Sequence, residues 1–254
     1  MPKQKEGSVA RGAPRISSVF LVVESAQTVR EGLCLALLSF GIKGIPVSTR
    51  SEALAAIKTH STIEGAVVDI DNRDVDGVKL IDDLKAGQET RRIAVVVHTV
   101  QARKEFVRKM VEIGVAGYLL KPFSPETAKA KLDSILSKLS THNANRKHIR
   151  LTPDPDELTR VSFRLRGLSQ LMSGRIVDIS LGGMAIELFN PPADSLFTKG
   201  IPIARLEFAL GGKALSPAGS VVTCRSGVLA VKFDTMSAAD RQALERYIFR
   251  RISS

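Results

Sequence analysis

The first 140 residues alternate short apolar runs with segments whose apolar residues recur at helical spacing. Val19–Val23 has the length and composition of a buried strand, and the apolar positions from Val29 to Phe40 follow the period of a helix. Further strands are predicted at Ile45–Ser48, Ala66–Asp69, Ile93–Val97 and Tyr118–Leu120, and further helices at Ser51–Thr59, Gly77–Lys85, Arg103–Ile113 and Pro125–Leu139. Five such units predict an α/β fold with a doubly wound, five-stranded parallel sheet, whose site lies at the carboxyl ends of the strands.

The rest of the chain has a different pattern, in which short β-branched or alternating runs are separated by Gly, Pro, Asn and Asp. Six strands are predicted, at Leu158–Leu165, Leu171–Ile179, Met184–Leu188, Ile203–Ala209, Ala214–Thr223 and Val228–Phe233. After them, Ser237 and Asp240 have the spacing of a capping box, and apolar residues from Leu244 to Ile252 form one helical stripe. This order predicts a small six-stranded antiparallel β-barrel with a C-terminal helix.

The change of pattern near residue 140 predicts two domains behind a polar N-terminal segment. Residues 1–14 are expected to be flexible, residues 15–140 to form the first domain and residues 141–254 the second. A short polar stretch, Thr141–Asn145, links the two. With 254 residues, of which 44% are hydrophobic, the chain can build a core in each domain.

The net charge of +11 makes anionic partners plausible, but the charge is spread along the chain. Lys and Arg outnumber Asp and Glu by 21 − 16 = 5 in residues 1–140 and by 16 − 10 = 6 in residues 141–254. Aromatic residues, which stack on bases, make up only 5% of the chain. These features argue against a nucleic-acid-binding protein, although a basic nucleic-acid-binding regulator stays open as an alternative.

Several other classes find no support in the residues. The four histidines are scattered, without the spacing of metal ligands, and no arrangement of residues typical of a catalytic site is evident, so we predict no enzyme. The N-terminal residues lack the apolar stretch of a signal peptide, and the longest apolar runs are far too short to span a membrane. We therefore expect a cytoplasmic protein.

Polar residues at the ends of the predicted parallel strands carry the first resemblance. Asp69 ends the third strand, Thr99 ends the fourth, Tyr118 begins the fifth, and Lys121 follows the fifth and precedes a proline. Together with Asp76 and the glycine after it, this pattern over residues 16–139 resembles the receiver domain of two-component response regulators. The resemblance implies that Asp69 is a phosphoacceptor and that Thr99, Tyr118 and Lys121 are switch positions.

One position departs from the receiver pattern. Receivers carry two adjacent acidic residues after the first strand, which hold Mg²⁺ together with the phosphoacceptor, whereas this chain has Glu24 and Ser25. Because Mg²⁺ favours carboxylate ligands, the site left by Glu24 and Asp69 is expected to be weak, with partial compensation from Asp71 or Asp74. We therefore favour a degenerate pseudo-receiver, kept for homodimer formation or partner docking, over a phosphorylated one.

A two-part motif at the start of the second domain carries the other resemblance. Arg146 and Arg150 form R-x-x-x-R, and Asp178, Ser180 and Gly183 form D-x-S-x-x-G. The planar guanidinium of arginine binds phosphate bidentately and stacks on purines, an aspartate accepts hydrogen bonds from guanine, and a glycine permits close approach. In order and spacing, these motifs resemble those of PilZ domains, which bind cyclic di-GMP. All five residues are therefore candidate ligands of this nucleotide.

Together the resemblances imply a cyclic di-GMP-binding signalling adaptor. Because the arginine motif lies at the junction of the two domains, ligand binding is expected to rearrange the domain geometry and so to signal to an unidentified protein partner. The main alternative is a response regulator that is driven by phosphorylation of Asp69.

Overall fold

The computed structural model describes residues 18–139, 148–154, 156–157, 159–165 and 170–253. The described residues fall into two units: residues 18–149 group with residues 249–253 in one, and residues 150–248 form the other. The N-terminal segment 1–14 and the polar stretch 141–145 lie outside the described residues.

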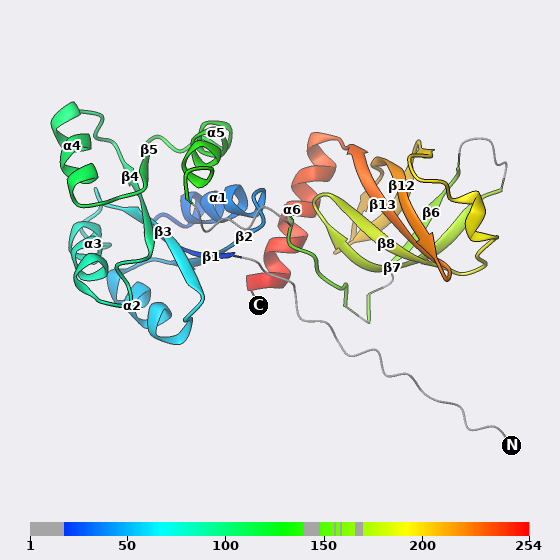
Figure 1. The fold of residues 1–254 in the computed structure, drawn as a ribbon, viewed down its shortest axis with the longest axis horizontal. Coiled ribbons are helices and arrows are strands. Elements are labelled where there is room, and N and C mark those ends of the chain that lie inside the picture. The colour runs from blue at the N-terminus through cyan, green and yellow to red at the C-terminus, as the bar shows by residue number, and fades with distance from the viewer. Residues whose placement is uncertain (1–17, 140–147, 155, 158, 166–169, 254) are drawn as a thin grey trace, which may run out of the picture. The chain divides into compact units, whose positions relative to one another are not determined.

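The first unit consists of five strands that alternate with five helices (Figure 1). Its strands are β1 (Ser18–Val23), β2 (Ile42–Val47), β3 (Ile63–Asp69), β4 (Ala94–Thr99) and β5 (Gly117–Leu120), and its helices are α1 (Gln27–Leu38), α2 (Arg50–Thr59), α3 (Gly77–Ala86), α4 (Lys104–Glu112) and α5 (Pro125–Leu136). All strands are parallel, in the order β2-β1-β3-β4-β5. The predicted doubly wound sheet is confirmed.

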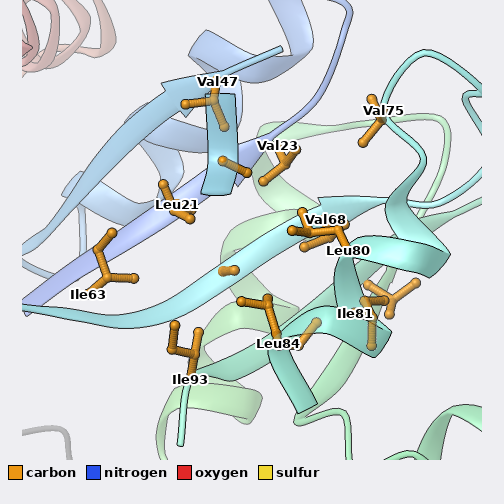
Figure 2. Packing of buried hydrophobic residues seen from close by; sticks show 14 of the residues in the cluster. Leu21, Val23, Val47, Ile63, Val68, Val75, Leu80, Ile81, Leu84 and Ile93 are labelled. Atoms are coloured by element: carbon orange, nitrogen blue, oxygen red, sulfur yellow. The ribbon is translucent and has the colours of Figure 1, made fainter. Parts of the chain in front are cut away.

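Two apolar cores cover the two faces of this sheet, because alternate residues of each strand point in opposite directions. Leu21 and Val23 of β1 pack with residues from α2, α3 and α4 in one core, part of which is drawn in Figure 2. Phe20 and Val22 pack with α1 and α5 in the other. Burial on both faces explains why the strands read as continuous apolar runs.

Strand β2 begins at Ile42, three residues before the predicted start at Ile45. The segment contains Gly44 and Pro46, which interrupt the apolar run and concealed the first half of the strand. Pro46 is tolerated because β2 is an edge strand, so its missing N–H costs no hydrogen bond on the open side.

The second unit is an antiparallel sheet followed by a helix. Its strands are β6 (Arg160–Phe163), β7 (Met172–Ser180), β8 (Gly183–Leu188), β9 (Pro202–Ile203), β10 (Leu206–Leu210), β11 (Lys213–Leu215), β12 (Ala218–Arg225) and β13 (Val228–Thr235), with a 3₁₀ turn (Asp194–Leu196) and helix α6 (Ala238–Ser253). The strand order is β11-β10-β6-β7-β8-β13-β12-β9.

Two of the six predicted apolar runs are each divided into two strands, which gives eight strands in the sheet. The first divided run gives β9 and β10. Strand β9 pairs with β12 at one edge of the sheet, whereas β10 pairs with β6 and β11 near the other edge. The chain therefore passes from one margin of the curled sheet to the other between Ile203 and Leu206. The second division lies at Pro217, whose carbonyl accepts a hydrogen bond from the Leu206 N–H at 2.9 Å. This bond joins the two margins and supports the barrel-like curl.

Helix α6 begins where the capping pattern predicts, since the Ser237 hydroxyl oxygen accepts a hydrogen bond from the Asp240 N–H at 3.0 Å. Leu244 and Ile248 of its apolar stripe are completely buried. None of the described helices combines the length and the apolar composition that a membrane-spanning helix needs.

Candidate functional sites

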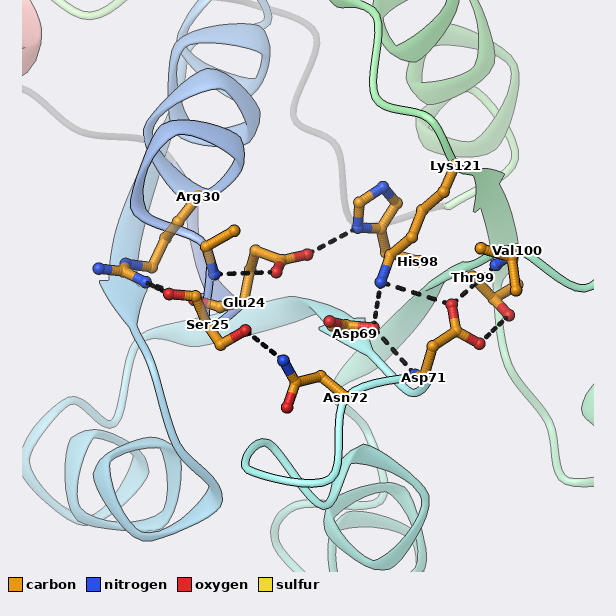
Figure 3. A network of polar contacts seen from close by, with 11 residues as sticks. Glu24, Ser25, Arg30, Asp69, Asp71, Asn72, His98, Thr99, Val100 and Lys121 are labelled. Atoms are coloured by element: carbon orange, nitrogen blue, oxygen red, sulfur yellow. Dashed lines mark hydrogen bonds and ion pairs between the residues drawn. The ribbon is translucent and has the colours of Figure 1, made fainter.

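Polar side chains gather at the carboxyl end of the parallel sheet, where the sequence predicted a site (Figure 3). Glu24 follows β1, Asp69 ends β3, Thr99 ends β4 and Lys121 follows β5. Because β1, β3, β4 and β5 are consecutive neighbours in the sheet, their ends bring these side chains together. All but Thr99 line a cavity of about 450 Å³, which Ser25, Asp71 and His98 also line.

Asp69 is buried and held by two donors. Its Oδ1 accepts hydrogen bonds from the Lys121 ammonium at 2.6 Å and from the Asp71 N–H at 2.9 Å. Burial alone would lower the pKa of Lys121, but the bond to Asp69 and the charges of Glu24 and Asp71 outweigh it and raise that pKa. Lys121 is therefore a permanent cation here. The peptide bond that follows it, to Pro122, is cis.

The start of α3 lies directly against the Asp69 backbone. A Cβ atom added to Gly77 would lie 2.0 Å from the Asp69 carbonyl oxygen, so only glycine permits this approach. The preceding residue, Asp76, has a φ of 48° in the left-handed region, where aspartate is better tolerated than most residues. This pair of residues brings the loop after β3 back toward the sheet.

The Asp71 carboxylate points toward β4 and β5. Its Oδ1 accepts a hydrogen bond from the Thr99 hydroxyl at 2.8 Å, and its Oδ2 accepts one from the Val100 N–H at 2.7 Å. The same Oδ2 lies 3.4 Å from the Lys121 ammonium. Thr99 and Lys121 thus meet at Asp71, a residue that the sequence suggested only as a partial metal ligand.

Glu24 is paired with a buried histidine. Its Oε2 lies 3.0 Å from Nδ1 of His98, and its Oε1 accepts a hydrogen bond from the Ala26 N–H at 3.1 Å. Burial would raise the pKa of Glu24, but the hydrogen bonds from His98 and Ala26 and the charge of Lys121 hold it below its usual value. The carboxylate is therefore ionised, and His98 donates to it through Nδ1. The other ring nitrogen, Nε2, is buried without a hydrogen-bond partner among the described residues.

These residues do not fit a Mg²⁺ ion. Both carboxylate oxygens of Glu24 already accept hydrogen bonds, and the Ser25 hydroxyl accepts one from the Asn72 amide at 2.6 Å. Mg²⁺ requires an octahedral set of oxygen ligands and prefers carboxylates. Within the described part of the chain, no group of three or more acidic, His or Cys side chains could hold a metal ion.

Tyr118 lies apart from this network. It is half-buried on β5, and the Lys131 ammonium of α5 lies 4.8 Å from the centre of its ring. This distance is that of a cation–π contact, which is modest at a partly exposed site. Tyr118 therefore contacts the helix that follows β5 rather than the cluster around Asp69.

The second predicted site lies at the end of β7. Leu151 and Ile179 form an isolated antiparallel bridge, with N–H to carbonyl distances of 3.0 and 2.9 Å, and both side chains are buried. This bridge places the adjacent Arg150 near Asp178, with 3.5 Å between the guanidinium and Oδ1. The side chains are 58% and 30% exposed, so the pair is open to solvent. Arg146 lies outside the described residues.

Ser180 ends β7 and Gly183 begins β8, on the two sides of a two-residue turn. The Ser180 hydroxyl is buried, donates to the Gly183 carbonyl at 3.2 Å and accepts from the Gly182 N–H at 3.3 Å. A Cβ atom added to Gly183 would lie 2.2 Å from the carbonyl oxygen of Val231 in β13. Both residues thus have a role in packing the turn, while their predicted contact with a ligand stays a prediction.

Family comparisons match one domain family to each part of the chain. Residues 20–133 match the model of the response regulator receiver domain, and residues 144–250 match that of the PilZ domain. The chain joins a receiver domain to a PilZ domain. Both halves of the two-part motif fall within the PilZ match, and the cluster around Asp69 falls within the receiver match.

Individual proteins resemble part of the chain. Chemotaxis protein CheY-3 of Vibrio cholerae is 25% identical over 119 residues, 47% of this chain and 92% of that protein. Probable transcriptional regulator ycf27 of Cyanidium caldarium is 28% identical over 129 residues, 50% of this chain and 49% of that protein. The structure of chemotaxis response regulator CheY4 of Vibrio cholerae aligns with a TM-score of 0.43 and 19% identity, over 46% of this chain and 98% of that one.

The receiver cluster contains two residues whose roles the sequence did not reveal. In the sequence, His98 lacks the spacing of a metal ligand, and Asn72 has no feature that distinguishes it from other loop residues. A signal for His98 was present, because a lone histidine in an apolar strand must find a polar partner inside the fold. For Asn72 the sequence holds no comparable signal, since loop asparagines are common in turns.

Gly183→Ala tests whether this glycine serves packing in the PilZ domain. We expect the variant to lose about 1–3 kcal/mol in the free energy of unfolding, because the new methyl group collides with the β13 backbone. Urea denaturation of the full chain measures the loss. A variant of unchanged stability would contradict the packing role.

Ser25→Asp tests the poor fit of the receiver domain to Mg²⁺. A second carboxylate beside Glu24 adds a charged oxygen ligand, so millimolar Mg²⁺ should raise the melting temperature of the variant more than that of the wild type. Each kcal/mol of stabilisation corresponds to about 2–4 °C. Without metal, the variant should be slightly less stable because the carboxylates repel one another.

Asp69→Asn in the Ser25→Asp background is the matched control, and it should remove the response to Mg²⁺. A strong response of the wild type to Mg²⁺ would show that the receiver domain holds the metal as it stands.

Proposed function

We propose that the PilZ domain binds cyclic di-GMP and that the protein is a signalling adaptor. The observation that carries this proposal is the position of Arg150 beside Asp178 at the open end of β7. Cyclic di-GMP offers anionic phosphates to a guanidinium and guanine donor groups to a carboxylate. One cation and one anion, held next to each other by the Leu151–Ile179 bridge, match both requirements.

The exposure of this pair favours ligand binding. Ion pairs in solvent contribute only about 0–1 kcal/mol, so a phosphate can replace Asp178 as the partner of Arg150 at little cost. We further propose that Arg146, four residues earlier in the chain, supplies the second guanidinium. Ser180 and Gly183, on the two sides of the turn next to Asp178, complete the proposed ligand set.

The proposed mechanism uses the place of the arginine motif in the chain. It lies between the receiver match, which ends at residue 133, and the strands of the PilZ domain. Ligand binding to Arg146 and Arg150 would restrict this segment and favour one arrangement of the two domains, which a protein partner then recognises. A ligand shifts such an equilibrium only by its different affinity for the two arrangements.

The receiver cluster favours this function over control by phosphorylation. The Asp69 carboxylate is buried under Lys121, and the groups that would hold Mg²⁺ are engaged in hydrogen bonds with protein groups. We propose that the receiver domain acts mainly as an interaction domain, with homodimer formation as one role. Uptake of a phosphoryl group by wild-type Asp69, from acetyl phosphate with Mg²⁺, would support the alternative instead.

Calorimetric titration of the full chain tests the ligand. We expect cyclic di-GMP to bind far more tightly than GMP, because the mononucleotide cannot engage both arginines and Asp178 at once. Equal affinities for the two nucleotides would contradict the proposal.

Substitutions in the PilZ domain test the individual contacts. Arg146→Ala, Arg150→Ala and Asp178→Ala should each weaken binding by about 1.5–3 kcal/mol, or roughly 10- to 150-fold. Arg150→Lys should also weaken binding, because lysine keeps the charge but loses the planar fork.

Arg205→Ala is the matched control, since Arg205 is 65% exposed and pairs with Glu207 in the same unit. It should bind like the wild type. If Arg150→Lys also did so, net charge alone would account for the affinity.

A further inference from the structure

Three hydrogen-bond donors of the receiver domain surround the carboxylate of Asp71. They are the Thr99 hydroxyl at 2.8 Å, the Val100 N–H at 2.7 Å and the Lys121 ammonium at 3.4 Å (Figure 3). Two come from the end of β4 and one from the residue after β5. The Asp71 side chain is only 19% exposed, so it fills this space rather than extending into water.

A hydroxyl, a backbone N–H and an ammonium directed at one point form an environment for an oxyanion. Such donors bind phosphate as readily as carboxylate, since each gives a charge-assisted hydrogen bond to an anionic oxygen. The positions of the donors are determined by the fold. Thr99 is completely buried, the Val100 N–H belongs to the backbone, and Lys121 is anchored by its bond to Asp69.

We propose that the Asp71 carboxylate takes the place of an external anion. It occupies the donors Thr99, Val100 and Lys121 and thereby keeps free phosphate and phosphoryl groups away from them. The inference concerns the receiver domain and does not depend on binding of cyclic di-GMP. It explains why the loop after β3 carries an acid that turns back toward the sheet.

Two physical reasons favour Asp71 over a free anion. First, its carboxylate is tethered, because its own N–H is bonded to Asp69 Oδ1 at 2.9 Å, and an intramolecular ligand has a high effective concentration. Second, the Asp69 and Asp71 carboxylates already share the one Lys121 ammonium, so a further anion beside them would be repelled. A phosphoryl group on Asp69 would compete with Asp71 for the same donors.

Binding of inorganic phosphate to the full chain, without metal ions, tests this inference. In Asp71→Ala, we expect phosphate to shift the Val100 amide resonance in nitrogen-15 correlation spectra, with an affinity at least about tenfold higher than in the wild type. Reading the signal at Val100 separates this site from phosphate bound to the PilZ domain. Adding Lys121→Ala to the Asp71→Ala variant should abolish the gain in phosphate affinity.

Asp74→Ala is the matched control, because it removes an equal charge from the same loop and no hydrogen bond or ion pair joins the Asp74 side chain to the described residues. It should behave like the wild type. Asp71→Asn keeps the shape of the side chain and a neutral acceptor, so its affinity for phosphate should rise by less than that of Asp71→Ala. It serves as the test if the alanine variant does not fold.

The inference is overturned if phosphate shifts the Val100 resonance equally in the wild type and in the Asp71 variants. It is equally overturned if the affinity for phosphate rises as much in Asp74→Ala as in Asp71→Ala. It is also overturned if neither Asp71 variant binds phosphate at Val100.

Discussion

The Lys121 ammonium lies between the carboxylates of Asp69 and Asp71, and the polar end of the parallel sheet depends on this contact. Two acids this close would repel each other if no cation separated them. With Lys121 in place, Asp69 stays buried, Asp71 turns toward Thr99, and the loop after β3 lies against the strands. The backbone approach at Gly77 holds the other end of that loop.

The two domains use charged pairs in opposite ways. In the receiver domain, the pairs Asp69–Lys121 and Glu24–His98 are buried or nearly so, and their polar atoms are largely engaged. Breaking such a pair leaves an uncompensated charge, which costs far more than breaking a surface pair. In the PilZ domain, Arg150 is exposed, Asp178 is partly exposed and their charged groups are 3.5 Å apart, so they can exchange partners easily. The contrast is that between a closed internal network and a solvent-accessible pair at the proposed binding site.

The residues of the first unit allowed most of its fold to be predicted, because burial on both faces of a parallel sheet leaves an apolar run for nearly every strand. Pro46 and Gly44 hid the start of β2, since a local pattern cannot show that a strand lies at the edge of a sheet. In the second unit, the division at Pro217 and the crossing between Ile203 and Leu206 followed from pairing with distant strands. Strand pairing of this kind is not encoded in local periodicity.

The sequence by itself determined the order of strands and helices in the first unit, the two families and the positions of their motif residues, because these depend on periodicity and on spacing along the chain. Only the tertiary structure decided which polar groups meet. Glu24 follows β1 and His98 lies in β4, and Asp71 turns toward β4 and β5 and not toward a metal ligand set. Gly183 is required by the β13 backbone, which comes much later in the chain. Hydrogen bonds form between neighbours in space, and packing alone makes these residues neighbours.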